Sequence, residues 1–572
     1  MAFAMRGTGS GRRSLLAAAA LLLSASLPAA GEEGRQAGAA PDARQPALLP
    51  LPAHVSNGST VELQCGRTYG GTLDLKGKYR VTVRTVGDCG KAAITPAQPV
   101  ADWARHQGNI WSAALRFEPA QVAIGDKALE RAHFPNKPQT WAKGKSRNPA
   151  TLEYRMPNGD LDGALLVYRP FDWMIETRPI ADYKDGVVTL GPKTGDAFDP
   201  PEKVDFYVEG KLWMLDSPGE WAYANGRLYL WAPDGKSPEG RAWAAPASNG
   251  IDASDSRQVT IDGVRIFLAQ VGIDGGNSND LHILNSEIRN SGQDGIFAGG
   301  KGLLVDNAAI ANSVQNGIYG YYGITDSVVT NSTITGTGTA GMPKRSKGGI
   351  VFEEASGQRI ANNKVLQSSY IGIRVHRNAL VANNLIDGAC LVLTDCGGIY
   401  TFARDKQALN VRIEGNTVKN LAQRYAHGIY LDDHANGVVV TRNILAGNPG
   451  GLQVHNGFGN QIMHNVFSGS AYEHILFNDT GEGGHIRHNR VYGNTFISDR
   501  GGVTYRLWSV RDEEAARRFG QFNDNRYSST PGDFAEVAGI GMLDFSGWKR
   551  RMKQDDRSSL KAERPVPRGK TM

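Results

Sequence analysis

The sequence predicts an all-β fold, in which a parallel β-helix is interrupted by an inserted antiparallel β-domain. Short strand-like segments recur after residue 250 at spacings of 21 to 32 residues, with no amphipathic helices between them. Such a period is typical of a solenoid. Residues 98–245 lack this repeat and contain eight of the ten tryptophans. The chain of 572 residues is long enough to hold both parts.

Two markers define the repeat. An Asn stands in the middle of each unit, and a Gly followed by an aliphatic residue begins the next strand. The Asn markers are Asn285, Asn307, Asn331, Asn363, Asn384, Asn416, Asn443, Asn465 and Asn494. The Gly markers are Gly272, Gly295, Gly317, Gly349, Gly372, Gly398, Gly428 and Gly451. Asn suits the turns, because it tolerates the left-handed conformation and its amide can bond to the unit above. Units this short exclude propeller blades, and the Leu spacing excludes leucine-rich repeats.

The other regions complete the predicted domain organisation. Residues 1–40 are expected to be a signal peptide and linker, because Arg12 and Arg13 precede an apolar run at residues 15–27. Sec and twin-arginine export both fit this pattern. The further segments are N-terminal rungs at 41–97, an inserted β-sandwich-like domain at 98–245, the main β-helix at 246–510, a C-terminal cap at 511–548 and a disordered basic tail at 549–572. We expect an exported, periplasmic or secreted monomer without a membrane span.

Charge and cysteine content restrict the function classes. Lys and Arg number 63 against 57 Asp and Glu, and this small, dispersed excess argues against a nucleic-acid partner. In an oxidising compartment the four cysteines are expected to pair locally, Cys65 with Cys89 and Cys390 with Cys396. Four free thiols are the alternative.

Strand alternation predicts where the chemistry lies. If the Ile after each Gly points inward, the residues after it on alternate positions point outward. In five consecutive units these outward pairs are Val351 and Glu353, Arg374 and His376, Tyr400 and Phe402, Tyr430 and Asp432, and Gln453 and His455. Such side chains, stacked about 4.8 Å apart, are predicted to form one exposed patch of titratable and aromatic groups.

Paired carboxylates suggest glycoside hydrolysis in this patch. Asp395 lies in the turn that enters one strand, and Asp432 and Asp433 end the next. Two carboxylates that flank a glycosidic bond can act as acid and as nucleophile or base. We predict Asp395, Asp432 and Asp433 as catalytic candidates. The predicted substrate-binding residues are Glu353, Arg374, His376, Tyr400, Tyr430, His434 and His455.

No cofactor is required by this chemistry. Asp432, Asp433, His434 and His455 are an alternative ligand set for a divalent cation such as calcium, although their spacing is not specific for a metal.

The repeat resembles the right-handed parallel β-helix family of pectate-lyase-like carbohydrate enzymes over roughly residues 250–510. With the insert, which carries Arg131-Ala132-His133-Phe134-Pro135-Asn136 and a Pro-Gly-Glu-Trp segment, the chain resembles β-helix glycoside hydrolases of the β-xylosidase and α-fucosidase type. This resemblance implies a poly- or oligosaccharide substrate. It also implies that Asp395 and the Asp432–Asp433 pair are the acidic residues, because similar Asp-Gly-Gly-Ile-Tyr and Ile-Tyr-Leu-Asp-Asp segments carry them in those hydrolases.

Two alternative functions remain open at this point. A polysaccharide lyase or uronate C5-epimerase would use Arg374 to neutralise a carboxylate and Tyr400, Tyr430, His376 or His455 as base. A non-catalytic glycan-binding protein is the other alternative, because one fold hosts many functions.

Overall fold

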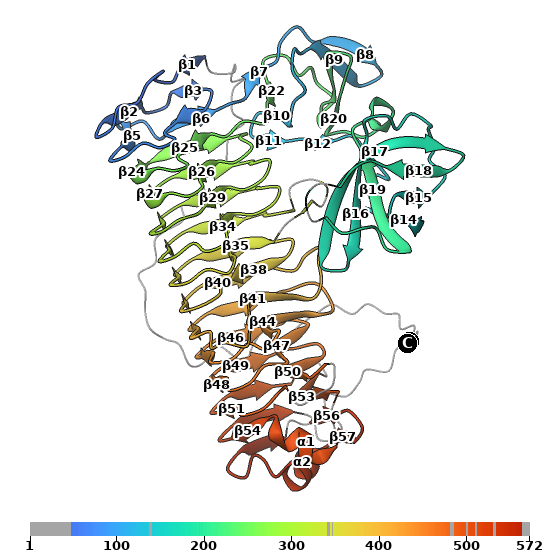
Figure 1. Cartoon of the computed structure of the whole chain (residues 1–572), viewed down its shortest axis with the longest axis vertical. Coiled ribbons are helices and arrows are strands. Elements are labelled where there is room, and N and C mark those ends of the chain that lie inside the picture. Colours follow the sequence, from blue (N-terminus) through green and yellow to red (C-terminus); the bar gives the residue numbers. More distant parts are fainter. Residues whose placement is uncertain are drawn as a thin grey trace. The chain divides into compact units, whose positions relative to one another are not determined.

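The computed structural model describes residues 47–562 except 137–139, 194, 196, 340, 341, 343, 346, 481–484, 499–501, 510, 511 and 530–533. The predicted signal peptide lies outside these residues. In the described part of the chain, successive coils of three short strands form three long sheets (Figure 1). The predicted parallel β-helix with an antiparallel insert is therefore confirmed. No helix among the described residues has the length and apolarity needed to cross a membrane.

The three sheets contain 15, 13 and 14 of the described strands. The first runs from β1 (Leu48–Pro50) to β58 (Ser559–Ala562), and the second from β2 (Thr60–Gln64) to β54 (Gly520–Asn523). The third, here called the site sheet, consists in order of β4 (Leu73–Asp74), β23 (Ile251–Asp252), β26 (Ile273–Gly275), β29 (Ile296–Ala298), β32 (Ile318–Gly320), β35 (Gly348–Phe352), β38 (Ile371–Arg374), β41 (Cys396–Phe402), β44 (Ala426–Asp432), β47 (Gly450–His455), β50 (Glu473–Asn478), β53 (Val503–Trp508), β56 (Ala535–Val537) and β57 (Gly541–Leu543).

The β-helix begins before the insert and resumes after it. Strand β6 (Ala92–Thr95) pairs in parallel with β25 (Val264–Phe267), although about 170 residues separate them in sequence. The intervening chain from β7 (Gln98–Pro99) to β22 (Ala242–Ala245) forms the insert.

The core fills the inside of the coils. The Ile that follows each Gly marker points inward, and Ile350, Ile373, Ile399 and Ile429 are all fully buried and paired in register. Alternation then turns their neighbours outward, which fixes the face on which the candidate site lies.

The Asn markers occupy two different positions, which the sequence pattern did not separate. Asn285, Asn307 and Asn331 adopt the left-handed conformation themselves and lie toward solvent. From Asn363 onward the marker is buried, and the left-handed residue is the one before it, as at Asn362 and Asn383. The buried markers form a ladder in which the backbone N–H and the side-chain amide of one Asn both donate to the side-chain oxygen of the next. The members of the ladder are Asn363, Asn384, Asn416, Asn443, Asn465, Asn494 and Asn525.

The insert contains a barrel rather than the expected sandwich. Its main sheet follows the order β19 (Lys203–Glu209), β14 (Ala142–Asn148), β15 (Thr151–Glu153), β18 (Val187–Leu190), β17 (Met174–Lys184) and β16 (Leu165–Phe171). Strand β19 pairs with β14 and also with β16, so the sheet closes and has no free edge at that seam. The expectation of a sandwich was wrong, because alternation along single strands does not reveal closure. Two smaller sheets, of four and five strands, link the barrel to the β-helix.

The C-terminal region carries the two α-helices of the described chain. Helix α1 (Glu513–Arg518) and helix α2 (Phe545–Met552) contact each other, and Trp548 of α2 is buried. The tail was expected to be disordered from residue 549, but α2 continues to Met552 and β58 pairs in parallel with β55 (Arg526–Ser529). The basic composition concealed this strand, which adds a further rung. Residues 563–572 lie outside the described part.

Candidate active site

Register places the predicted outward residues of the site sheet in one column. Val351, Arg374, Tyr400, Tyr430 and Gln453 are paired in that order across five adjacent strands. Most of this column is covered: Val351 is fully buried and Tyr430 is 2% exposed. The expected exposed patch is therefore mostly buried.

A cavity of about 310 Å³ opens over the ends of β38, β41 and β44 and is closed on another side by β17 of the insert. Seven of the ten predicted site residues line it, namely Arg374, Asp395, Tyr400, Tyr430, Asp432, Asp433 and His455. The structure therefore brings together the three catalytic candidates and four of the predicted binding residues.

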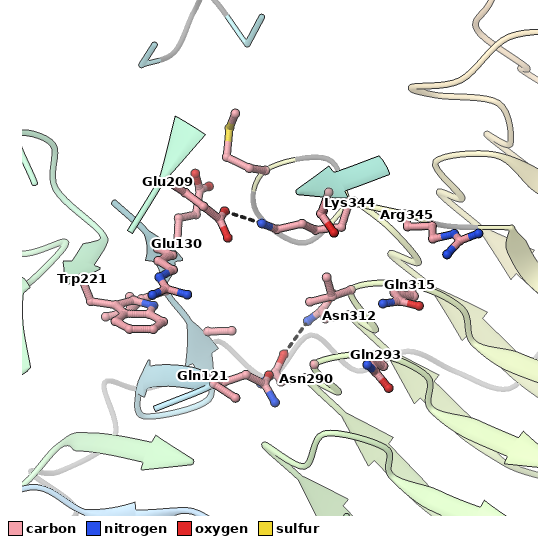
Figure 2. A pocket seen from close by; sticks show the side chains of 18 of the residues that line it. Gln121, Glu130, Glu209, Trp221, Asn290, Gln293, Asn312, Gln315, Lys344 and Arg345 are labelled. Atoms are coloured by element: carbon pink, nitrogen blue, oxygen red, sulfur yellow. Dashed lines mark hydrogen bonds and ion pairs between the residues drawn. The ribbon is translucent and has the colours of Figure 1, made fainter. Parts of the chain in front are cut away.

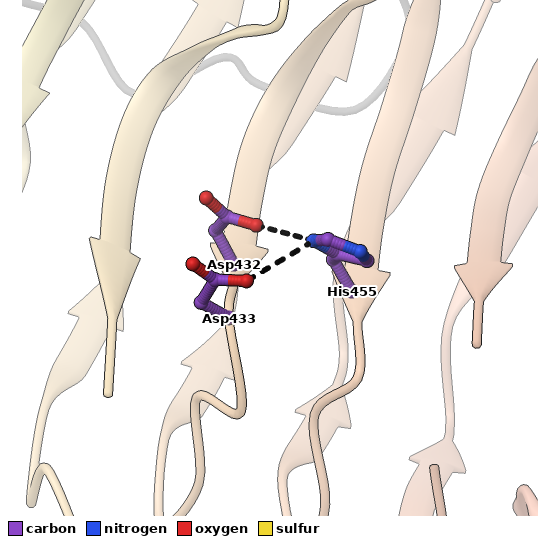
Figure 3. A group of neighbouring side chains, drawn as sticks. All are labelled: Asp432, Asp433 and His455. Carbon is purple, nitrogen blue, oxygen red and sulfur yellow. Dashed lines mark hydrogen bonds and ion pairs between the residues drawn. The ribbon is translucent and has the colours of Figure 1, made fainter. Parts of the chain in front are cut away.

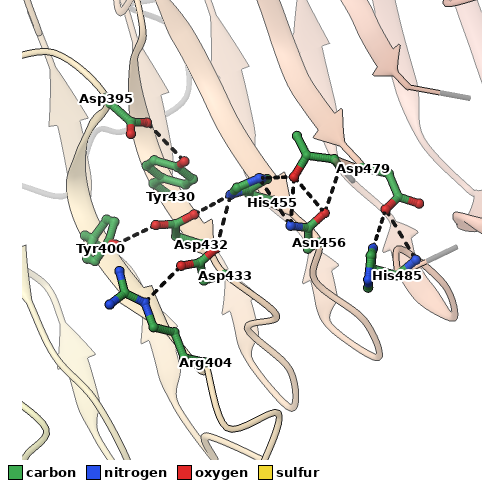
Figure 4. Close-up of polar contacts among 11 residues, drawn as sticks. Asp395, Tyr400, Arg404, Tyr430, Asp432, Asp433, His455, Asn456, Asp479 and His485 are labelled. Atoms are coloured by element: carbon green, nitrogen blue, oxygen red, sulfur yellow. Dashed lines mark hydrogen bonds and ion pairs between the residues drawn. The ribbon is translucent and has the colours of Figure 1, made fainter. Parts of the chain in front are cut away.

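Asp432 is the most heavily hydrogen-bonded carboxylate in this group. Tyr400 Oη donates to Asp432 Oδ2 at 2.6 Å (Figure 4). His455 Nδ1 lies 2.6 Å from Asp432 Oδ1 (Figures 3 and 4). Burial acts to raise the pKa of Asp432, but the bonds and charge of His455 and the Tyr400 hydroxyl outweigh it and lower the pKa. Asp432 is therefore held as an anion, and its charge in turn raises the pKa of His455 against the effect of burial.

Asp395 is placed in the opposite electrostatic environment. Its carboxylate accepts one hydrogen bond, from Tyr430 Oη to Oδ1 at 3.1 Å (Figure 4). Burial, and next the nearby charge of Asp432, raise the pKa of Asp395, and the Tyr430 hydroxyl offsets only part of this effect. Among the described residues, the other oxygen of Asp395 has no hydrogen-bond partner and is free to carry a proton.

The turn that carries Asp395 is fixed from three directions. A disulfide joins Cys390 to Cys396, which confirms the predicted local pairing, as does the Cys65–Cys89 disulfide. From the insert, Arg169 Nη2 donates to the Val392 carbonyl at 2.6 Å, and the Asp172 carbonyl accepts from Thr394 N–H at 3.2 Å. Asp395 itself adopts the left-handed conformation with φ of 53°.

Asp433 is less buried than Asp432 and lies beside two basic side chains. Arg404 Nε donates to its Oδ2 at 3.0 Å, and His455 Nδ1 lies 3.8 Å from its Oδ1. Asp433 and the next residue, His434, both have positive φ values, of 29° and 65°. Backbone strain of this kind is concentrated at functional sites.

Asp432, Asp433 and His455 bring one potential ligand atom each to within 4.8 Å of the others (Figure 3). This set does not fit calcium, which takes six to eight oxygen ligands. His455 already binds Asp432, and the guanidinium of Arg404 supplies a positive charge beside Asp433.

Three predicted binding residues lie outside the cavity. Glu353 is 2% exposed and pairs with Arg374 at 2.7 Å and Lys347 at 2.9 Å, so it positions these cations. His376 is buried with its ring 5.4 Å from that of Phe402, and burial lowers its pKa. The ring of His434 lies 5.1 Å from that of His485.

Sequence reasoning missed several residues that line the cavity, including Trp173, Tyr322, Tyr370 and Arg404. Tyr370 Oη donates to the backbone carbonyl of Asp395 at 3.0 Å. These residues lie in turns or in the insert, where strand alternation gives no signal. The concentration of tryptophan in the insert was the one clue to Trp173.

A larger cavity, of about 1030 Å³, lies between the insert and the turns that precede β29 and β32 (Figure 2). Its walls carry amides such as Gln293 and Asn312 and mutually paired charges such as Glu209 with Lys344. Arg345 lines both cavities, but the three catalytic candidates line only the smaller one.

Comparison with known proteins agrees with this architecture. The family described as "Right handed beta helix region" matches residues 269–467, so the predicted right-handed β-helix is confirmed there. No curated protein matches the chain significantly. A solved structure named "Glycoside hydrolase" matches with a TM-score of 0.55 and 12% identity, over 81% of this chain and 92% of that one.

Two further solved structures match less closely in shape. The complex of XylC with xylose has a TM-score of 0.41 and 13% identity, over 91% of this chain and 84% of that one. The A-module of the Azotobacter vinelandii mannuronan C-5 epimerase AlgE6 has a TM-score of 0.34 and 13% identity, over 56% and 86%. At such identities the likeness concerns the fold, and function has to be argued from the site.

Proposed function

We propose that this protein is a carbohydrate-active enzyme that hydrolyses a glycosidic bond in the 310 Å³ cavity. The observation that carries the proposal is a pair of carboxylates in one cavity whose pKa values are displaced in opposite directions, upward for Asp395 and downward for Asp432. Such a division separates an acid from a base at one pH. The β-helix fold shared with a structure named as a glycoside hydrolase is compatible with this chemistry.

In the proposed reaction, Asp395 is the general acid. Its raised pKa favours the protonated carboxyl group more than the lowered pKa of Asp432 does, and the proton passes to the glycosidic oxygen as the bond to the anomeric carbon breaks. Asp432 either attacks that carbon directly and forms a glycosyl ester that a water molecule then hydrolyses, or takes a proton from the water whose oxygen attacks the carbon. His455 and Tyr400 keep Asp432 ionised and oriented.

Asp433 is assigned a positioning role. It balances the charge of Arg404 and lies beside the ring of His455, and therefore holds both side chains at the edge of the cavity. Trp173 and Tyr400 provide aromatic surface for a sugar ring.

The geometry supports elimination or epimerisation less well. Those reactions need a base of suitable pKa, but burial and the neighbouring carboxylates raise the pKa of Tyr400 and Tyr430 well above the ordinary value. Both hydroxyls already donate to carboxylates. Of the histidine candidates, His455 is bound to Asp432 and His376 lies outside the cavity.

Export to an oxidising compartment forms part of the proposal. The two disulfides fit such a compartment, where a polysaccharide substrate is also accessible.

The direct test is incubation of the purified protein with a panel of glycans, read both for new reducing ends and for the ultraviolet absorbance of unsaturated uronates. Hydrolysis predicts reducing ends without that absorbance. Rising absorbance would identify a lyase and overturn the proposal.

The roles of the two carboxylates are tested separately on the glycan that responds. Asp432→Asn is expected to lose about 10²–10⁴-fold on every substrate. Asp395→Asn is expected to lose as much on the glycan but to retain most activity on an aryl glycoside, whose phenolate leaves without protonation. Asp433→Asn is the matched control and should lose far less. Equal losses by Asp395→Asn on both substrates would contradict its role as acid.

A further inference from the structure

Exposed aromatic side chains gather on the site sheet some distance before the carboxylates. Tyr321 and Tyr322, in the turn after β32, are 50% and 51% exposed. Their rings contact each other edge-on at 5.3 Å, and Tyr321 also contacts Phe297 of β29 at 5.9 Å and Tyr319 of β32 at 6.4 Å. These four rings are called the aromatic platform below.

The platform combines rings packed on the site sheet with rings exposed to solvent. Phe297 and Tyr319 are paired in register across β29 and β32, with ring centroids 5.8 Å apart. Lys347 Nζ lies 2.8 Å from Tyr319 Oη, and that ring is almost fully buried. Within the described part of the chain, the half-exposed Tyr321 and Tyr322 have no comparable cover. Clustered exposed aromatic rings of this kind mark binding surfaces.

The platform is continuous with the candidate active site. Tyr322 lines the same 310 Å³ cavity as Asp395 and Asp432. Strand β32 lies four strands before β44 in the site sheet, and strands lie about 4.8 Å apart, so the platform is about 19 Å from Asp432 along the β-helix axis. That distance corresponds to several sugar units of an extended chain.

We propose that the aromatic platform binds the part of the glycan remote from the cleaved bond, and that the natural substrate is therefore a chain of several sugars. The inference rests on the proposed function and extends it to substrate length. The apolar face of a pyranose ring stacks on a tyrosine ring, whereas a polar surface alone would not favour that contact. Polar groups of the cavity lie between the platform and the carboxylates, among them Lys347 and Arg374, and are placed to bind the hydroxyls of the intervening sugars.

The larger cavity (Figure 2) offers a competing route for the same chain, because Arg345 borders both cavities. Its walls hold amides and paired charges but no exposed ring of the platform. The observations favour the platform, and the route through the larger cavity is an outcome of the test.

The test compares Tyr321→Ala with Tyr321→Phe and Gln293→Ala. Tyr321 lies outside the 310 Å³ cavity, and Gln293 lines the larger one. Kinetics are measured on the polymer that responds in the glycan panel and on an aryl monoglycoside of the same sugar. Tyr321→Ala is expected to raise the KM for the polymer by about two- to tenfold, from the usual strength of one aromatic contact, and to leave the KM for the aryl glycoside unchanged. Tyr321→Phe keeps the ring and should behave as the wild type.

Binding measured without turnover separates this inference from the proposed function. In the Asp432→Asn background, Tyr321→Ala should weaken polymer binding by the same factor in calorimetry. If the wild-type protein hydrolyses no glycan but Tyr321→Ala still weakens polymer binding, the proposed function is refuted and the binding role of the platform is supported. Equal affinity of Tyr321→Ala and wild type, or weakening by Gln293→Ala instead, would overturn the platform.

Discussion

Removal of one hydroxyl tests which carboxylate is the acid and which is the base. Tyr400→Phe deletes the donor that lies 2.6 Å from Asp432 Oδ2 and leaves the ring in place. A hydrogen bond to a charged group contributes about 1.5–3 kcal/mol, and one pKa unit corresponds to about 1.4 kcal/mol. The pKa of Asp432 should therefore rise by about one to two units.

This change should appear in the pH dependence of kcat/KM. If Asp432 must be ionised, its titration sets the acidic limb of a bell-shaped profile, and Asp395, which must be protonated, sets the alkaline limb. Because the lost hydrogen bond favours the ionised form, the acidic limb of Tyr400→Phe should move to higher pH by about one to two units. Activity on the plateau should change little.

Tyr430→Phe is the matched control, since it deletes the 3.1 Å donor to Asp395 Oδ1. Loss of this hydrogen bond raises the pKa of Asp395, so the alkaline limb of Tyr430→Phe should move to higher pH. The acidic limb should stay in place, and the profile should therefore widen. Because the two carboxylates interact, each limb reports an apparent pKa of the pair. A shift of the alkaline limb in Tyr400→Phe would reverse the assigned roles. Unshifted limbs in both variants, with unchanged thermal stability, would refute the assignment altogether.

Three further predictions concern the scaffold. Cys390→Ser with Cys396→Ser should lower stability by about 2 kcal/mol and reduce kcat by loosening the Asp395 turn; an unchanged kcat would contradict the positioning role. Burial raises the pKa of Asp294 to about 6, so this residue stays protonated to a higher pH in the folded protein than in the unfolded protein. The stability of the protein therefore falls as the pH rises from about 4 to 6. Asp294→Asn keeps the side-chain oxygen that accepts from Asn316. Its free energy of unfolding, measured with denaturant, should therefore increase by about 2–3 kcal/mol at pH above 6 and by little near pH 4. An equal increase at both pH values would exclude ionisation as the cause. Asn416→Ala breaks the buried ladder between Asn384 and Asn443 and should cost at least about 3 kcal/mol in the same assay, whereas a loss below 1 kcal/mol would show that the ladder is dispensable.

The parts of the fold that depend on local periodicity were predictable from the sequence. The period-two alternation after each Gly fixed the inward Ile residues and, with them, the column from Val351 to Gln453. The Asn markers were predictable only in part. An exposed left-handed Asn and a buried ladder Asn one position later look the same in a single sequence, although their environments differ.

The parts of the site that depend on long-range contacts were not predictable in this way. Burial of the column follows from packing against other parts of the chain, and the closed barrel of the insert follows from the pairing of β19 with both β14 and β16. Strand alternation also led to the prediction that Glu353 binds the substrate. Alternation indicates on which face of a strand a side chain lies, but not whether a cationic side chain covers it. In the structure Arg374 and Lys347 enclose that carboxylate.

The proposed division of roles between Asp395 and Asp432 gives the insert a function. A turn aspartate on a bare β-helix would be solvated and ionised, with a pKa near its ordinary value. Here the insert binds the turn through Arg169 and Asp172, and the strand β17 that follows closes the cavity over it. Burial is the largest contribution to the raised pKa of Asp395, and residues 173–175 of the insert line the cavity beside it. Asp432, on the strand itself, receives its two donors from neighbouring rungs and needs no such cover to stay ionised. In the proposed mechanism the β-helix thus provides the base, and the insert helps a turn residue to act as the acid.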